Sequence, residues 1–182
     1  MDATVRERMI GSAIVLLAQH GYQGTSFSTV LDRSQTPRGS IYHHFPGGKD
    51  QLIAAAIERA GDHAVAVLDA MEGGSALDVV DGFVAIWRSV LERSGFTAGC
   101  SVLAVTVSAD STELLTSAGK VFSTWAGRIA TLLHSAGVDE TRAHSFATVL
   151  IAATEGAVVL CRAERSLDPL AKVHEELRRL AP

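Results

Sequence analysis

The sequence predicts an all-α protein of about nine helices, on three observations. Hydrophobic residues make up 47% of the 182 positions and only four residues are proline, which suits long helices rich in Ala, Leu and Val. An aromatic content of 5% disfavours an all-β sandwich. The most strand-like run, residues 101–107, is interpreted as a buried helix. We expect an N-terminal domain of residues 1–47 and a larger domain of residues 48–182.

The first helix is predicted over residues 4–20, because apolar residues recur there on one helical face and Gly21 stops the pattern. Residues 1–3 are expected to lead straight into this helix, with no signal peptide before it. The apolar stripe is Ile10, Ala13, Ile14 and Leu17.

Two short helices separated by a polar turn are predicted after Gly21. Thr25 or Ser26 can cap the first of them, and residues 33–35 are polar enough for the turn. The apolar residues of the first short helix are Phe27, Val30 and Leu31.

The second short helix is predicted to start at Thr36–Pro37, because a capping hydroxyl followed by proline is a strong helix start. Ile41 and Phe45 fall on one face to be buried, and residues 46–48 end the helix. The side chains left outside are Arg38, Ser40, His43 and His44, with Tyr42 at the edge. Two helices with this turn and this exposed face are what a helix-turn-helix presents to the major groove of DNA.

Six further helices are predicted in the rest of the chain, with ends at glycines or at cap-plus-proline starts. They span about residues 49–71, 76–93, 100–108, 110–136, 139–164 and 168–180. The run of residues 149–161 is apolar nearly all round its helix, as expected for a helix that faces both a core and a partner chain.

The charge distribution permits nucleic-acid binding only through a few placed contacts. The net charge is −4, but residues 1–50 hold five Lys or Arg against four Asp or Glu, while the remainder holds 11 against 16. Bulk charge therefore cannot drive binding to DNA, and each of two subunits would have to supply specific contacts.

Cysteine usage and hydropathy predict a reduced, soluble, cytoplasmic protein. Cys100 and Cys161 form no CxxC motif and no disulfide framework. The longest apolar run, residues 149–161, has 13 residues and contains Glu155, which is too short and too polar to span a bilayer. No membrane attachment is expected.

Catalytic and metal chemistry find little support, so we expect no enzyme, no cofactor and no metal. A phosphate loop and an HExxH motif are absent from the sequence, and Cys100 has no histidine at an obvious triad spacing. His43 and His44 are adjacent in a helix and point about 100° apart, so sharing an ion is difficult. Contact with phosphates or bases is the favoured role for both.

Several motifs resemble the N-terminal signature of the TetR family of one-component repressors. They are Gly21-Tyr22, Gly24-Thr25-Ser26, the run RGSIYHHF of residues 38–45 and the run KDQL of residues 49–52. Three others resemble the branch of LmrA- and YxaF-like regulators. They are PGGK of residues 46–49, Gly99-Cys100-Ser101 and AERSLDPL of residues 163–170.

The resemblance implies a homodimer, a C-terminal domain that binds a drug or metabolite, and release from an operator when that inducer binds. We therefore predict a repressor that binds a palindromic double-stranded DNA operator as a dimer and is released by a small, largely apolar ligand. The alternative is a small-molecule-binding helical protein without regulatory DNA binding.

The predicted DNA contacts centre on the second short helix. Gly39 inside a helix costs about 1 kcal/mol against alanine, which either close approach to DNA or packing against the first helix would explain. Lys49 at the start of a long helix suits a phosphate, the alternative being a solvated lysine. The predicted set is Thr25, Ser26, Thr36, Pro37, Arg38, Gly39, Ser40, Tyr42, His43, His44 and Lys49.

The predicted ligand site gathers most aromatic residues of the C-terminal part, from Phe83 to Trp125. Each one alone is typical of a core, but as a set they suit an apolar pocket. Cys100 is either a redox sensor or, by the more common pattern, a small buried residue. The predicted set is Phe83, Trp87, Phe96, Cys100, Leu103, Phe122, Trp125 and Glu155.

The predicted dimer interface lies on the last two helices. Glu155 is costly to bury unless it is paired, so it either binds a ligand group or pairs with an arginine such as Arg162 across the dimer, and the sequence leaves both open. The predicted interface residues are Leu150, Thr154, Val158 and Arg162.

Overall fold

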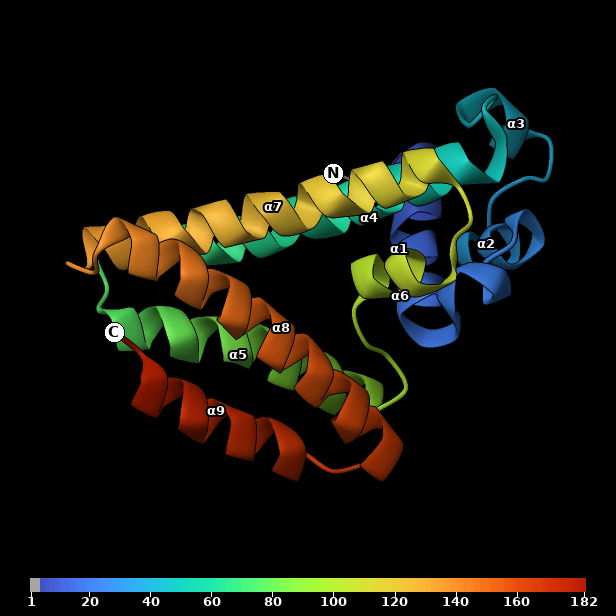
Figure 1. Cartoon of the computed structure of the whole chain (residues 1–182). Coiled ribbons are helices and arrows are strands. Elements are labelled where there is room, and N and C mark those ends of the chain that lie inside the picture. The colour runs from blue at the N-terminus through green and yellow to red at the C-terminus, as the bar shows by residue number, and fades with distance from the viewer. Residues whose placement is uncertain (1–3) are drawn as a thin grey trace. The chain divides into compact units, whose positions relative to one another are not determined.

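The computed structural model describes residues 4–182, and these form nine helices and no strand (Figure 1). The all-α prediction is confirmed, including the helical interpretation of residues 101–107, while the prediction for residues 1–3 lies outside the described residues. The helices are α1 Val5–Gly24, α2 Phe27–Ser34, α3 Ser40–His44, α4 Gly48–Asp69, α5 Ala76–Ser94, α6 Ser101–Ser108, α7 Thr112–Ser135, α8 Glu140–Glu164 and α9 Asp168–Leu180.

The chain divides into two compact units. The first holds the residues up to Gly61 together with Cys100–Val121, and the second holds Asp62–Gly99 and Phe122–Pro182. Helices α4 and α7 are therefore continuous segments that contribute to both units. The predicted functional boundary after residue 47 concerns DNA binding and stays a prediction.

Helix α1 organises the first unit. Thr4 and Glu7 close a capping box, in which the Glu7 amide donates to Thr4 Oγ1 at 3.2 Å and the Thr4 amide donates to the Glu7 carboxylate at 2.8 Å. The backbone hydrogen bond from Thr4 lowers the pKa of Glu7. Gly21, at φ +70°, kinks the helix at the predicted stop. The buried face packs against α2 and α6 and consists of Met9, Ile10, Ala13, Leu16 and Leu17.

A glycine brings α4 and α7 close together in the first unit. A Cβ atom added at Gly61 would lie 2.8 Å from Cγ1 of Val121. Gly61 is buried, and no side chain larger than hydrogen fits there without a shift of Val121.

Helices α5, α8 and α9 pack pairwise in the second unit (Figure 1). Polar contacts tie α9 to α5: Oδ1 of Asp81 lies 2.7 Å from Nε2 of His174, and its other oxygen accepts from Arg178. Burial of the Asp81 carboxyl raises its pKa, but these two hydrogen bonds and the two positive charges outweigh burial and lower it. In the same unit Arg128 of α7 pairs with Asp69 at 2.5 Å and with Glu72 at 3.2 Å.

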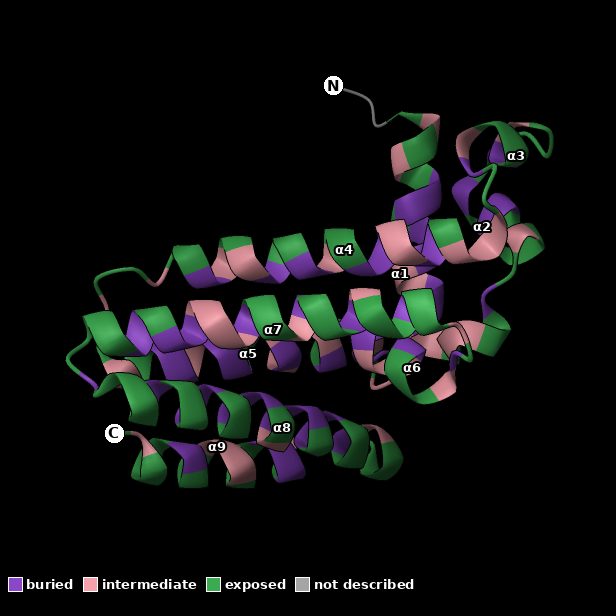
Figure 2. Ribbon diagram, turned by 45° about the horizontal axis from the view of Figure 1, so that its top comes forward, coloured by how far each residue is buried: buried purple, intermediate pink, exposed green. Residues whose placement is uncertain are grey.

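Helix α8 is the one described helix whose length and composition would suit a membrane span. The apolar part of this helix is therefore longer than the 13-residue run of residues 149–161. However, 44% of its most apolar window is buried, and the helix contacts α5 and α9, as a core helix does. Exposed and buried residues alternate along α8 in Figure 2.

Candidate functional site

Ser26 begins α2. The Thr29 amide donates to Ser26 Oγ at 3.2 Å, and the Ser26 amide donates to Thr29 Oγ1 at 2.9 Å, so threonine completes the capping box. Thr25 has a different role, because its hydroxyl is buried and donates to the Gly21 carbonyl at 2.8 Å. Of the two predicted caps, Ser26 is the one that the structure uses, and Thr25 closes the kink of α1.

Helix α3 begins at Ser40, and the predicted start at Thr36–Pro37 is corrected. The Thr36 hydroxyl is buried and lies 2.7 Å from Ser34 Oγ, so it does not cap a helix. The Pro37 carbonyl accepts the Ser40 amide at 3.0 Å and the Ser40 hydroxyl at 2.6 Å. These contacts form a turn over residues 37–39, which shortens α3 to five residues.

Gly39 is free of steric demands from the protein. It has helical backbone angles of φ −69° and ψ −19°, and a Cβ atom added there would meet nothing within 4 Å. Packing against α1 therefore does not require glycine at this position. The other explanation, a close approach of DNA to the backbone, stays a prediction.

Two buried residues anchor α3. Ile41 and Phe45 are both 0% exposed, and the Arg6 guanidinium of α1 lies over the Phe45 ring, 5.4 Å from its centroid. Tyr42 is 69% exposed and meets the Phe27 ring of α2 edge-on, with centroids 5.6 Å apart. One face of the five-residue helix therefore packs against the protein, and the other face is exposed to solvent.

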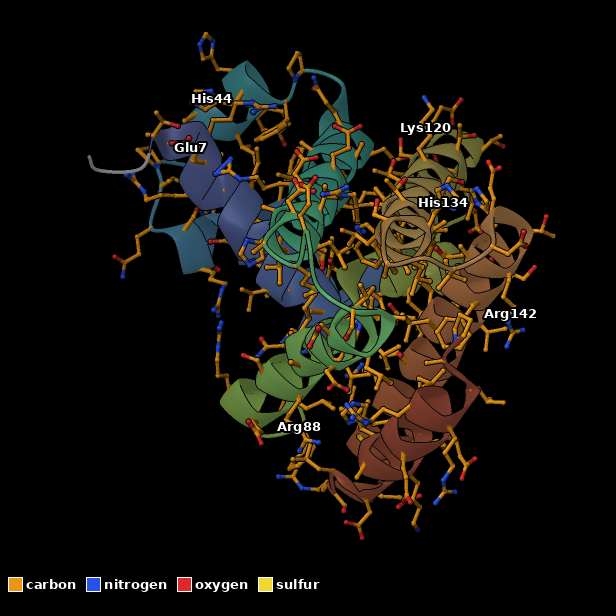
Figure 3. The ribbon with its side chains drawn as sticks, turned by 90° about the vertical axis from the view of Figure 1, so that its left-hand side faces the viewer. Glu7, His44, Arg88, Lys120, His134 and Arg142 are labelled. Atoms are coloured by element: carbon orange, nitrogen blue, oxygen red, sulfur yellow. The ribbon has the colours of Figure 1, made fainter. Side chains whose placement is uncertain are left out.

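The remaining predicted DNA residues fall into three classes. His44, labelled in Figure 3 on α3, is half-buried and its ring lies 5.3 Å from that of exposed His43. Ser26, Pro37, Arg38, Gly39, Tyr42 and His43 are exposed; Ser40, His44 and Lys49 are half-buried; Thr25 and Thr36 are buried. The two buried threonines support the helix-turn-helix from inside.

Lys49 joins the start of α4 to the end of α1. Its ammonium donates to the Tyr22 carbonyl at 2.8 Å and lies 3.7 Å from the centroid of the Tyr22 ring. The Tyr22 hydroxyl donates to Asp50 Oδ1 at 2.8 Å, which raises the pKa of Tyr22, while burial lowers the pKa of Lys49. Sequence analysis named Tyr22 and Asp50 only as parts of family motifs and not as site residues, because no periodicity links two residues that lie 27 or 28 positions apart in the chain.

Four aromatic rings predicted for the ligand site form one chain of edge contacts in the second unit. Trp87 lies 6.4 Å from Phe83 and 6.3 Å from Trp125, and Phe122 lies 5.5 Å from Trp125, between ring centroids. Phe83, Trp87 and Trp125 are buried. We call these four residues the aromatic cluster.

The other predicted ligand residues have separate surroundings. Phe96 is half-buried at φ +65°, where its amide donates to the Leu91 carbonyl at 2.9 Å and ends α5. Cys100 caps α6 through its sulfur, which accepts the Leu103 amide at 3.3 Å, and both residues belong to the first unit. Glu155 is buried in α8 and interacts within the chain.

Three of the four predicted dimer residues face into the protomer, and the fourth, Arg162, is half-buried. Leu150, Thr154 and Val158 are at most 1% exposed, and Arg162 donates to the Thr97 carbonyl of its own chain at 3.1 Å. The apolar residues exposed on α8 lie on an adjacent face, one residue or about 100° away. We call them the exposed α8 stripe: Val149, Ala152, Gly156, Val159 and Leu160.

Comparison with known proteins gives matches along most of the chain. The family model of bacterial regulatory proteins, tetR family, matches residues 10–56, and the C-terminal domain model of LmrA/YxaF-like transcriptional regulators matches residues 76–176. An uncharacterized HTH-type transcriptional regulator of Mycobacterium tuberculosis is 38% identical, over 96% of this chain and 93% of that protein. The HTH-type transcriptional regulator LmrA of Bacillus subtilis is 29% identical, over 91% of this chain and 90% of that protein.

The solved structures agree on the fold. A TetR transcriptional regulator from Legionella pneumophila superposes with a TM-score of 0.87 at 22% identity, over 100% of this chain and 99% of that chain. At this identity the likeness concerns the fold alone.

Proposed function

Because this chain belongs to the TetR family of transcriptional regulators, in its LmrA/YxaF-like branch, we propose that it is a repressor that binds a palindromic operator as a homodimer and leaves it when a small, largely apolar ligand binds. The family and the relatives are transcriptional regulators and not enzymes. The cytoplasm, where operator DNA lies, is the proposed location.

The geometry of α3 carries the DNA-binding proposal. Ile41 and Phe45 are buried and anchor the helix to the protein. Tyr42 and His43 are exposed on the helix, and Arg38 is exposed in the turn before it. Arginine pairs bidentately with guanine edges, while tyrosine and histidine reach phosphates or bases. A recognition helix of two turns or fewer then reads only a few base pairs, so affinity requires a second copy at a half-site one helical turn, about 34 Å, away.

The exposed α8 stripe supports the dimer. Val149, Val159 and Leu160 are 46%, 52% and 51% exposed, and Gly156 lies between them with open space where a Cβ atom would stand. Large apolar side chains side by side on one helix favour burial against a partner. A second copy of the same helix would bury the stripe with two-fold symmetry.

The aromatic cluster supports the ligand, and α4 supports the coupling. The cluster offers ring faces and edges to an apolar molecule. Helix α4 is one continuous 22-residue helix, about 33 Å long, that contributes to both compact units. A ligand that favours one position of this helix would change the distance between the DNA-binding regions of the two subunits.

The test is a fluorescence-anisotropy titration of the dimer with a labelled duplex from the region upstream of its own gene, with an unrelated duplex of equal length as the control. The proposal requires tighter binding to the upstream duplex, by about 10³-fold or more at physiological salt. Equal binding to both duplexes would favour the small-molecule-binding alternative.

A further inference from the structure

The indole N–H of Trp87 is a buried donor without an acceptor. The Trp87 side chain is only 6% exposed, and its Nε1 atom has no hydrogen-bond partner among the described residues. Buried tryptophans usually direct this N–H to a partner, and a donor left unpaired opposes folding. The unpaired atom therefore calls for an acceptor that the chain itself does not supply.

The surroundings of Trp87 are aromatic. Phe83 and Trp125 meet its ring edge-on, with interplanar angles of 79° and 62°. Ring edges and faces attract further aromatic rings in the same tilted arrangements. Trp87 and Trp125 are also the only two tryptophans of the chain, so every indole signal of the protein reports on this cluster.

A second polar atom with no partner lies in the same compact unit. Thr154 Oγ1, in α8, is fully buried and makes no hydrogen bond within the described chain. Helix α8 packs against α5, which carries Trp87. Two unpaired polar atoms on two packed helices are unusual for a core that serves packing alone.

The buried residues also restrict the charge of a ligand. Among the described residues, Glu155 is the one buried charged side chain, and no lysine, arginine or histidine is buried. A buried anion would thus lack a buried cationic partner, which is costly. Glu155 itself interacts within the chain.

We propose that Trp87 donates its indole N–H to the acceptor of a neutral aromatic ligand, such as the carbonyl oxygen of a diaryl ketone. This inference rests on the proposed ligand-binding function and names the chemical class that the site takes. Trp87 is then the residue that discriminates between apolar ligands of the same shape. The faces of the aromatic rings in the cluster offer no hydrogen-bond donor that would distinguish a carbonyl from a methylene group.

Benzophenone and diphenylmethane test this selection, because they differ only in a carbonyl against a methylene group. Affinities for both are measured by calorimetry in wild type, Trp87→Phe and the matched control Trp125→Phe. Phenylalanine keeps an aromatic face and removes the donor, so the ratio of the two affinities should fall about tenfold in Trp87→Phe, the worth of one hydrogen bond. Trp125→Phe, which changes a ring of the same cluster without removing the Trp87 donor, should change both affinities alike and so keep the wild-type ratio.

Nitrogen-15 NMR of the two indole groups tests the hydrogen bond without changing Trp87. Benzophenone should move the Trp87 indole proton downfield, diphenylmethane should not, and Trp125→Phe assigns the two signals. The inference is overturned if the affinity ratio is the same in Trp87→Phe, if the Trp87 proton does not move with benzophenone, or if neither compound binds.

Operator release is measured separately, so the two proposals can fail independently. If benzophenone binds through Trp87 but leaves the upstream duplex bound, the ligand class stands and ligand-induced release fails. If the upstream duplex never binds, the repressor proposal fails and the ligand class is judged on the calorimetry and NMR alone.

Discussion

The Lys49 ammonium, at the start of α4, donates a hydrogen bond to the carbonyl of Tyr22, near the end of α1, with 2.8 Å between Nζ and the oxygen. This contact uses one of the three N–H donors of the ammonium, and the Tyr22 ring supports the charge from 3.7 Å. Two donors remain, and we propose that they bind a phosphate oxygen of the operator. The Tyr22 carbonyl thereby orients the ammonium at the helix start, where an anion is favoured.

The first prediction concerns Lys49 and salt. Operator affinity should fall steeply with salt, and Lys49→Ala should reduce the log–log slope by about 1 per subunit, because one fewer phosphate is neutralised. Anisotropy titrations at several salt concentrations measure the slope. Lys172→Ala, a change of an exposed lysine on α9, is the control and should leave the slope as it is. A slope that Lys49→Ala does not alter would confine Lys49 to its contact with Tyr22.

The second prediction concerns Arg38, which is exposed in the turn before α3. If its guanidinium reads a guanine edge, Arg38→Ala should weaken operator binding by about 1–3 kcal/mol and relax the preference at one base pair. Titration of the variant against operators substituted at single base pairs measures both effects. Equal weakening on every duplex would make Arg38 a phosphate contact, and unchanged binding would remove it from the interface.

The helix boundaries were largely predictable from sequence, because capping residues and glycines act locally. Helix α5, for example, was predicted over residues 76–93 and spans Ala76–Ser94. The start of α3 was not predictable by the same rule. The Ser34–Thr36 pair and the bonds of Ser40 to Pro37 compete with a proline-initiated helix, and they depend on the fold of the whole turn.

The contacts of the site were less predictable than its residue types. Hydrophobic periodicity identifies the buried face of an amphipathic helix, but α8 is apolar on several faces, so Thr154 and Val159 could not be assigned to core or surface from the pattern. Similarly, the sequence indicates that Trp87 belongs to an aromatic set, but a missing hydrogen-bond partner is visible only in three dimensions.

The third prediction concerns the buried hydroxyl of Thr154. Thr154→Val replaces an unpaired polar atom with a methyl group of similar volume, so the ligand-free protein should become more stable by about 1 kcal/mol. Urea unfolding of both proteins at one protein concentration measures the change. Ser145→Ala, on the exposed side of α8, is the control. A loss of stability in Thr154→Val would mean that a bound water molecule satisfies the hydroxyl.

The fourth prediction concerns the exposed α8 stripe. Leu160→Glu should weaken dimerisation by at least about tenfold, because each subunit loses apolar burial and places a charge in the interface. Sedimentation velocity over a range of concentrations measures the equilibrium. Val107→Glu, at a 73% exposed position of α6, introduces the same charge outside the stripe and should leave the dimer intact. A Leu160→Glu variant that dimerises like wild type would place the interface elsewhere.

The last prediction concerns pH and the docking of α9 on α5. The pKa of Asp81 is lowered in the folded protein, so its contribution to stability is complete above its unfolded pKa of about 4 and is lost as the pH falls through the lower, folded value. Asp81→Asn should therefore cost more stability at pH 7 than at pH 2–3, because pH 2–3 lies below the unfolded pKa and the contribution of the carboxylate is already declining there. Because Asp81 is 41% exposed, the difference should stay below about 1 kcal/mol. Urea titrations of both proteins at the two pH values measure it, with Asp62→Asn, an exposed aspartate of α4, as the control. An equal cost of Asp81→Asn at both pH values would show that the carboxyl stabilises α9 through shape and not through its charge.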